Sequence, residues 1–145
     1  MKILQRPRNQ KGFTLLELLI AISFLAISLL AVAGLQTTAI HSNSIANRLS
    51  AATSIAQQIM EELTARRIDD PILNSTNTNI NYNFNLNPMT TPVYSITVPN
   101  AGTYSATYST SPNNPTAGVT RLDIVVTGDA VTGRRVALST FVRTN

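Results

Sequence analysis

The architecture of this 145-residue chain is decided by the stretch KGFTLLE at residues 11–17 and by the apolar run behind it, LLIAISFLAISLLAVAGL at residues 18–35. The run contains no charged residue and two polar ones, Ser23 and Ser28. Its 18 residues, or 23 counted from Phe13, match the roughly 20 residues with which a helix crosses about 30 Å of hydrocarbon. Inside such a helix each serine hydroxyl can bond a carbonyl one turn back. The sequence therefore predicts a membrane-spanning helix.

Glu17 places a carboxylate at the start of this apolar run. An ionised carboxylate in hydrocarbon is costly, and ionisable residues within membrane segments usually have a function. We therefore expect Glu17 to have a specific function.

The charge before the run predicts its orientation. Four basic residues and no acidic residue precede it, namely Lys2, Arg6, Arg8 and Lys11. The positive-inside rule keeps such an end in the cytoplasm. The chain after Leu35 should therefore lie across the membrane.

Two simpler interpretations compete with this one. A secretory signal peptide is supported by Ala31-Val32-Ala33, which resembles a signal-peptidase site. Against it, the run exceeds the usual apolar core of about 7–15 residues, Glu17 interrupts its start, and the helical pattern continues past Gly34. An uncleaved anchor explains the length but not the combination of Gly12, Phe13 and Glu17.

Residues 11–17 resemble the type IV pilin and pseudopilin superfamily. Its members begin with a short basic leader that ends in glycine, followed by phenylalanine, threonine, two aliphatic residues and glutamate. The close resemblance covers about residues 11–36, and the run at residues 29–36 further resembles PilV-type minor pilins. Many major pilins have a proline in this part of the helix, where the present chain has only Gly34.

The resemblance implies a processing site and an assembly site. A prepilin peptidase would cut between Gly12 and Phe13 and methylate the new amine of Phe13. Glu17 would then pair with the Phe13 amine of its own or a neighbouring subunit. Such a pair in a poorly hydrated place would set the register of each incoming subunit.

Charge and cysteine content exclude several other functions. The formal charge is +4, but removing the four basic side chains of residues 1–12 leaves seven basic and seven acidic ones. The basic balance thus reports topology, and we expect no nucleic-acid partner. The chain has no cysteine, which excludes disulfides and thiolate chemistry. The outer domain must therefore depend on core packing.

The helix should continue beyond the membrane. Apolar residues recur with helical spacing at Ile45, Leu49, Ala52, Ala56, Ile59 and Leu63. Pro71 disfavours helix in the residue before it. We therefore predict one helix from about Phe13 to Ile68, whose second half, about residues 37–68, is amphipathic.

Beyond Pro71 the apolar period changes to two, which is typical of strands. Residues 77–87 alternate asparagine with Thr, Ile, Tyr, Phe and Leu, which predicts a half-buried strand with a solvated asparagine face. Further alternation occurs near residues 94–98, 104–108, 122–126 and 136–140, the last two as a hairpin. We expect an α+β fold in which the long helix packs on an antiparallel sheet of four to five strands, about residues 77–143. The resemblance implies the same pilin fold.

The sequence lacks the groups that an enzyme needs. His41 is the only histidine, and no nucleophile elbow or phosphate-binding glycine loop is present. We expect no enzyme activity and no cofactor. A calcium site formed by Asp69 with Asp70, or by Asp129, is the alternative, although acids at a helix end usually serve as caps.

These observations predict a structural protein. The expected division is a leader at residues 1–12, a membrane or filament-core helix at 13–36, and a periplasmic head at 37–145. The first hypothesis is a minor pilin that passes once through the bacterial inner membrane and then enters a pilus fibre with other subunits. The alternatives are a minor pseudopilin of a type II secretion system, a major pilin and, from another class, a membrane-anchored periplasmic binding module.

Overall fold

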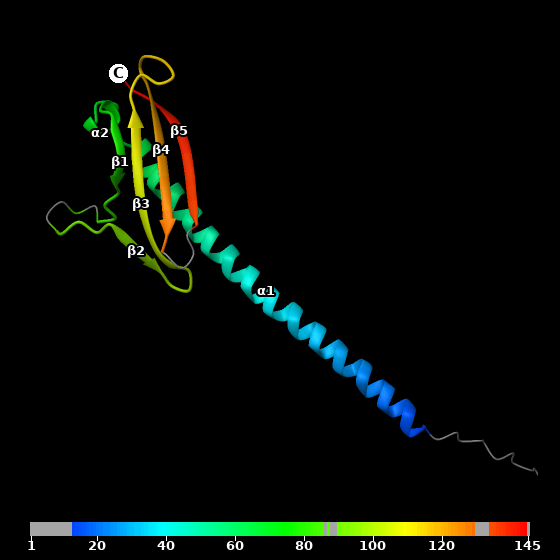
Figure 1. The fold of residues 1–145 in the computed structure, drawn as a ribbon. Coiled ribbons are helices and arrows are strands. Elements are labelled where there is room, and N and C mark those ends of the chain that lie inside the picture. Colours follow the sequence, from blue (N-terminus) through cyan, green and yellow to red (C-terminus); the bar gives the residue numbers. More distant parts are fainter. Residues whose placement is uncertain (1–12, 86, 88–89, 130–133, 145) are drawn as a thin grey trace, which may run out of the picture. The chain divides into compact units, whose positions relative to one another are not determined.

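The computed structural model describes residues 13–85, 87, 90–129 and 134–144 (Figure 1). Its elements are α1 (Leu15–Thr64), α2 (Pro71–Asn74), β1 (Asn77–Asn81), β2 (Ser95–Val98), β3 (Gly102–Ser111), β4 (Val119–Gly128) and β5 (Arg135–Arg143). The chain divides into two units, Met1–Ser42 and Asn43–Asn145. The α+β prediction of one long helix with a small antiparallel sheet is confirmed.

The described part of the first unit is the amino-terminal portion of α1. All of its side chains are exposed, including the whole apolar run. The hydroxyls of Ser23 and Ser28 donate to the carbonyls of Leu19 and Phe24, both at 2.8 Å, as the sequence predicts for serines inside an apolar helix. The polar groups of the apolar run at residues 18–35 are therefore bonded within the helix, and the surface of this run is almost entirely apolar.

The observed helix is shorter at both ends than the predicted range of residues 13–68. It begins at Leu15, after Thr14, and ends at Thr64. A second helix, α2, then begins at Pro71, and Asp70 caps it by accepting a hydrogen bond from the Ile72 amide at 2.8 Å. The turn that leads into this cap ends α1 four residues earlier than expected.

The sheet is antiparallel throughout. Its order is β1-β3-β4-β5, and β2 pairs with β3 beside β1 (Figure 1). β3 pairs with β1 near Thr107–Thr110 and with β2 near Gly102–Ser105, so two short strands share one of its edges. The predicted hairpin near the carboxyl end is confirmed as β4 and β5. β5 forms the other edge of the sheet.

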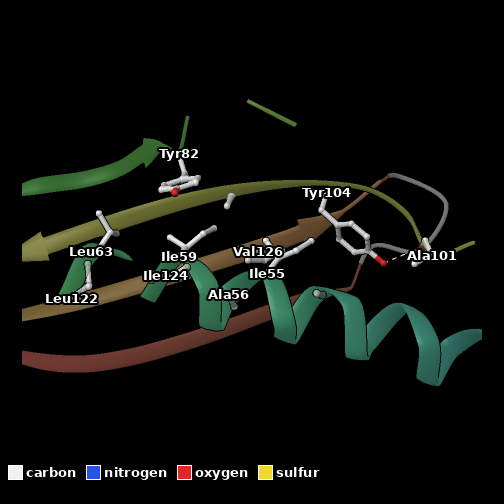
Figure 2. Packing of buried hydrophobic residues seen from close by; sticks show 12 residues of the cluster. Ile55, Ala56, Ile59, Leu63, Tyr82, Ala101, Tyr104, Leu122, Ile124 and Val126 are labelled. Carbon is white, nitrogen blue, oxygen red and sulfur yellow. Dashed lines mark hydrogen bonds between the residues drawn. The ribbon is translucent and has the colours of Figure 1, made fainter. Parts of the chain in front are cut away.

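The core of the second unit lies between the end of α1 and one face of the sheet. Figure 2 shows Ile55, Ile59 and Leu63 of the helix facing Leu122, Ile124 and Val126 of β4. Ala52, Ala56 and Ala106 are also buried, and their small side chains let helix and sheet approach closely. The predicted stripe is confirmed from Ala52 onward. Leu49 is 43% exposed, and the buried Ile55 had not been predicted.

The prediction of one half-buried strand over residues 77–87 was wrong. β1 ends at Asn81, most of its side chains are exposed, and its register shifts between Asn77 and Ile80. The shift contains Asn79, whose φ of 51° is a left-handed conformation that asparagine tolerates. Leu86 lies outside the described residues.

Several asparagine side chains of this segment hydrogen-bond to nearby backbone or to β3, so they do not form one solvated face. Asn83 Oδ1 accepts from the amides of Asn85 at 3.0 Å and Val93 at 2.8 Å. Asn77 Nδ2 donates to Thr110 Oγ1 at 2.8 Å. Asparagine competes with the strand ladder in this way, so it favours turns even where its spacing has a period of two.

Candidate functional site

The first candidate site is the start of α1. Phe13 and Thr14 precede the helix, and the Phe13 side chain is 84% exposed. Thr14 caps the helix, since its Oγ1 accepts from the Glu17 amide at 3.3 Å and its carbonyl accepts from the Leu18 amide at 3.2 Å. This role of Thr14 was not predicted from the sequence. The signal was available, because threonine three residues before glutamate matches a helix-capping box.

The Glu17 carboxylate is exposed in the first turn of α1. A negative charge is favourable there because the helix dipole is positive at this end. The described residues provide no hydrogen bond or ion pair to this carboxylate. In the uncut chain the Phe13 nitrogen is an amide and carries no charge. Glu17 and Phe13 thus lie in the same short segment, whereas Gly12 lies outside the described residues.

The surface behind this site is apolar and uncovered. Leu15, Leu30 and Leu35 are more than two-thirds exposed, and none of residues 13–44 is buried. Helix α1 is long and apolar enough to cross a membrane. A continuous apolar surface of this size must be covered by lipid or by other protein. Both the Phe13 nitrogen and Glu17 stand at one end of that surface.

The second candidate site is a polar network in the second unit. Arg66 donates to Glu62 at 2.8 Å and to Asp70 at 3.3 Å, and the Tyr82 hydroxyl donates to Glu62. Burial of the guanidinium opposes its charge, but the hydrogen bonds to the two carboxylates outweigh it and raise the pKa of Arg66. This network fixes the segment after β1 to the end of α1.

A pocket of about 260 Å³ lies beside this network, lined by Glu62, Arg66, Tyr82 and Tyr108 among others. Burial raises the pKa of Tyr108 and so favours its neutral form. The residues that line this pocket do not form a pair of catalytic groups suited to hydrolysis. Both nearby carboxylates, those of Glu62 and Asp70, accept hydrogen bonds from Arg66. The geometry is therefore that of a structural contact between chain segments.

The acids considered for calcium have other contacts. Asp69 accepts from Arg67 at 3.0 Å, and Asp70 caps α2 and pairs with Arg66. Within the part of the chain that the structure describes, no three acidic or histidine side chains gather as metal ligands.

Tyr104 connects the helix, the turn before β3 and the core. Its buried hydroxyl donates to the carbonyls of Ala101 at 2.9 Å, drawn in Figure 2, and Arg48 at 3.1 Å. Burial raises the pKa of this hydroxyl above its ordinary value of 10.0, against a smaller opposing effect of Arg48.

We expect Tyr104→Phe to lower the free energy of unfolding by about 1–2 kcal/mol, because the buried carbonyl of Ala101 loses its donor. The tyrosine also makes stability depend on pH. Because its folded-state pKa lies above the unfolded value, its contribution is complete below about pH 10 and is lost as the pH rises through the folded-state pKa. Urea unfolding at pH 7 and pH 11 measures both effects. An equal response of wild type and Tyr104→Phe to the higher pH would contradict this role.

Comparison with known proteins bears on the first site. A family model described as the prokaryotic N-terminal methylation motif matches residues 7–33, which include Gly12, Phe13 and Glu17. Comparison with curated proteins and with solved structures gave no match. The matched segment begins at residue 7 and ends within the apolar run, so the likeness covers the Gly12–Phe13 junction and most of the membrane-length helix. Residues 7–33 of this chain carry the N-terminal signature of type IV pilins and pseudopilins.

Proposed function

We propose that this chain is a minor pilin of a type IV pilus, made as a single-pass precursor in the bacterial inner membrane. The observation that carries the proposal is the methylation motif at residues 7–33, in register with an exposed apolar helix. The leader at residues 1–12 stays in the cytoplasm, the helix half at 13–36 spans the membrane, and the head at 37–145 lies in the periplasm. The head acts as a structural module and not as an enzyme.

Cleavage would convert the start of α1 into an assembly site. A prepilin peptidase cuts the bond between Gly12 and Phe13, and the Phe13 nitrogen becomes a charged amine that is then methylated. Glu17 is four residues away, and its carboxylate has no polar partner among the described residues. In the fibre, the apolar surface of α1 is covered by other subunits, and a Glu17–amine pair in that poorly hydrated core fixes their register.

The minor-pilin assignment rests on a further likeness. Residues 29–36 resemble PilV-type minor pilins, and the chain has only Gly34 in the part of the helix where many major pilins have a proline. A minor pseudopilin of a type II secretion system shares all of the N-terminal features. Loss of surface fibres on deletion of the gene, with secretion unchanged, distinguishes the pilus from the secretion system.

Mass spectrometry of the mature chain tests the cut site. We expect an amino terminus at N-methylated Phe13, and Gly12→Phe should leave the precursor uncut in the membrane because the bulky side chain does not fit where the peptidase accepts glycine. Gly12→Ala is the matched control and should still be cut. An amino terminus at Gly34 would instead establish a secretory signal peptide.

A further inference from the structure

The two edges of the sheet differ in how they are protected. The edge beside β3 is divided between two short strands, β1 and β2, and the left-handed Asn79 interrupts β1. The edge formed by β5 is continuous, with an unbroken register from Val119↔Arg143 to Thr127↔Arg135 (Figure 1). Bulges and short strands are the usual means of blocking strand addition. They occur at the first edge and are missing from β5.

The pairing pattern shows which backbone groups of β5 are free. The amide of Gly128 donates to the Arg134 carbonyl at 3.1 Å, and the amide of Thr144 donates to the Gly118 carbonyl at 2.9 Å. Both bonds involve even-numbered residues at the two ends of the β4–β5 pair. Antiparallel pairs alternate between bonded and non-bonded residues. The odd-numbered residues of β5 therefore point their N–H and C=O groups away from β4, namely Arg135, Ala137, Ser139, Phe141 and Arg143.

Several apolar side chains of β5 are also only partly buried. Val136 and Leu138 pack against the core but are only half-buried at this edge. Phe141 is 58% exposed on the opposite face. β5 contains no proline and no lysine, so charge protects only its ends, through Arg135 and Arg143. A strand added here would bond to the free backbone and cover the apolar side chains on the core face.

Arg135 and Arg143 determine which kind of strand can pair with β5. No ion pair joins Arg135 or Arg143 to any carboxylate within the described residues. If β5 paired with β5 of a second copy over its full length, antiparallel pairing would place Arg135 opposite Arg143 twice, and parallel pairing would place each arginine opposite itself. Like charges directly opposite each other are destabilising. A carboxylate at each end of the added strand would be attracted instead.

We propose that β5 is a docking edge for an extended segment of a different protein that carries acidic side chains about eight residues apart. The segment adds antiparallel to β5 as a sixth strand, with its two carboxylates opposite Arg135 and Arg143. The site lies wholly in the second unit and does not depend on the N-terminal motif. Its failure would leave the proposed function untouched.

Hydrogen exchange on the full chain in detergent micelles tests this proposal. The probe is the blocked peptide EVTVTVTVE, whose glutamates would face the two arginines. In the free protein the amides of Val136, Leu138, Thr140 and Val142 should be protected and those of the odd residues should exchange rapidly. The peptide should protect the odd amides. Its lysine counterpart KVTVTVTVK should bind roughly tenfold more weakly, from two cross-strand charge pairs.

Two variants test the mechanism. The double variant Arg135→Glu with Arg143→Glu should reverse the preference between the two peptides. Ala137→Pro should abolish protection, because proline removes an outward N–H, whereas Ala137→Thr keeps that N–H and should bind normally. A proline whose lost N–H faces away from the sheet is tolerated on an edge strand. Absence of odd-residue protection, equal binding of both peptides by wild type, or dimerisation of the protein alone through β5 would each overturn the proposal.

Discussion

Glu17→Leu is expected to leave membrane insertion and cleavage intact but to remove the protein from sheared fibres. A simple anchor has no use for this carboxylate, and leucine would only strengthen its membrane partitioning. A fibre subunit needs it, because the Phe13 amine would otherwise be buried without a partner. Breaking a buried ion pair costs about 3–5 kcal/mol, which corresponds to at least a roughly hundredfold loss of incorporation. Immunoblots of sheared fibres against the membrane fraction measure the ratio.

The capping geometry supplies a control for this prediction. Thr14 Oγ1 bonds the backbone amide of residue 17 and not its side chain, so Glu17→Leu retains that bond. Thr14→Ala removes the cap, at a cost of about 1 kcal/mol to the helix start, but keeps the carboxylate. It should therefore reduce incorporation far less than Glu17→Leu. Normal incorporation of Glu17→Leu would show that Glu17 does not set the register of assembly.

The sequence predicted those parts of the fold in which hydrophobic spacing and local chemistry agree. The stripe from Ala52 to Leu63 indicated the helical side of the core, and the alternation of Leu122, Ile124 and Val126 indicated β4, an inner strand of the sheet. The prediction of a strand over residues 77–87 failed because asparagine produced the two-residue period. That residue bonds nearby backbone groups in turns more readily than it completes a ladder. The two-residue alternation, taken alone, therefore predicted a strand longer than β1.

The candidate sites also include features that a local sequence pattern indicates and features that it does not. Phe13 and Glu17 were visible because they belong to a linear motif. The spacing of four between Glu62, Arg66 and Asp70 could have indicated the ion-pair cluster, although only Glu62 lies within α1. The contact of Tyr82 with Glu62 joins residues from different elements, and no local pattern specifies it. Under the proposed function, the cation that pairs with the Glu17 carboxylate would form only after cleavage and assembly. A single uncut chain therefore shows the acid without its cation.

Ile59→Ala is expected to lower the free energy of unfolding of the head by about 2–4 kcal/mol. The Ile59 side chain is 2% exposed between α1 and the sheet, so its removal loses transfer free energy and leaves a cavity. Alanine is the better helix former, which offsets only a few tenths of a kcal/mol. The head has no disulfide to limit the loss, because the chain has no cysteine. Urea unfolding followed by tyrosine circular dichroism of the full chain in detergent measures the change.

Gln58→Ala is the matched control, because Gln58 is the exposed neighbour of Ile59 on the same helix. It should change the free energy of unfolding by less than about 0.5 kcal/mol. Domains of this size are stable by roughly 5–15 kcal/mol, so Ile59→Ala would remove a substantial part of that margin. The helix within residues 15–42 has no buried contact to lose and should keep its helicity in detergent. If both variants unfolded at the same urea concentration as wild type, the helix–sheet core would not be what stabilises the head.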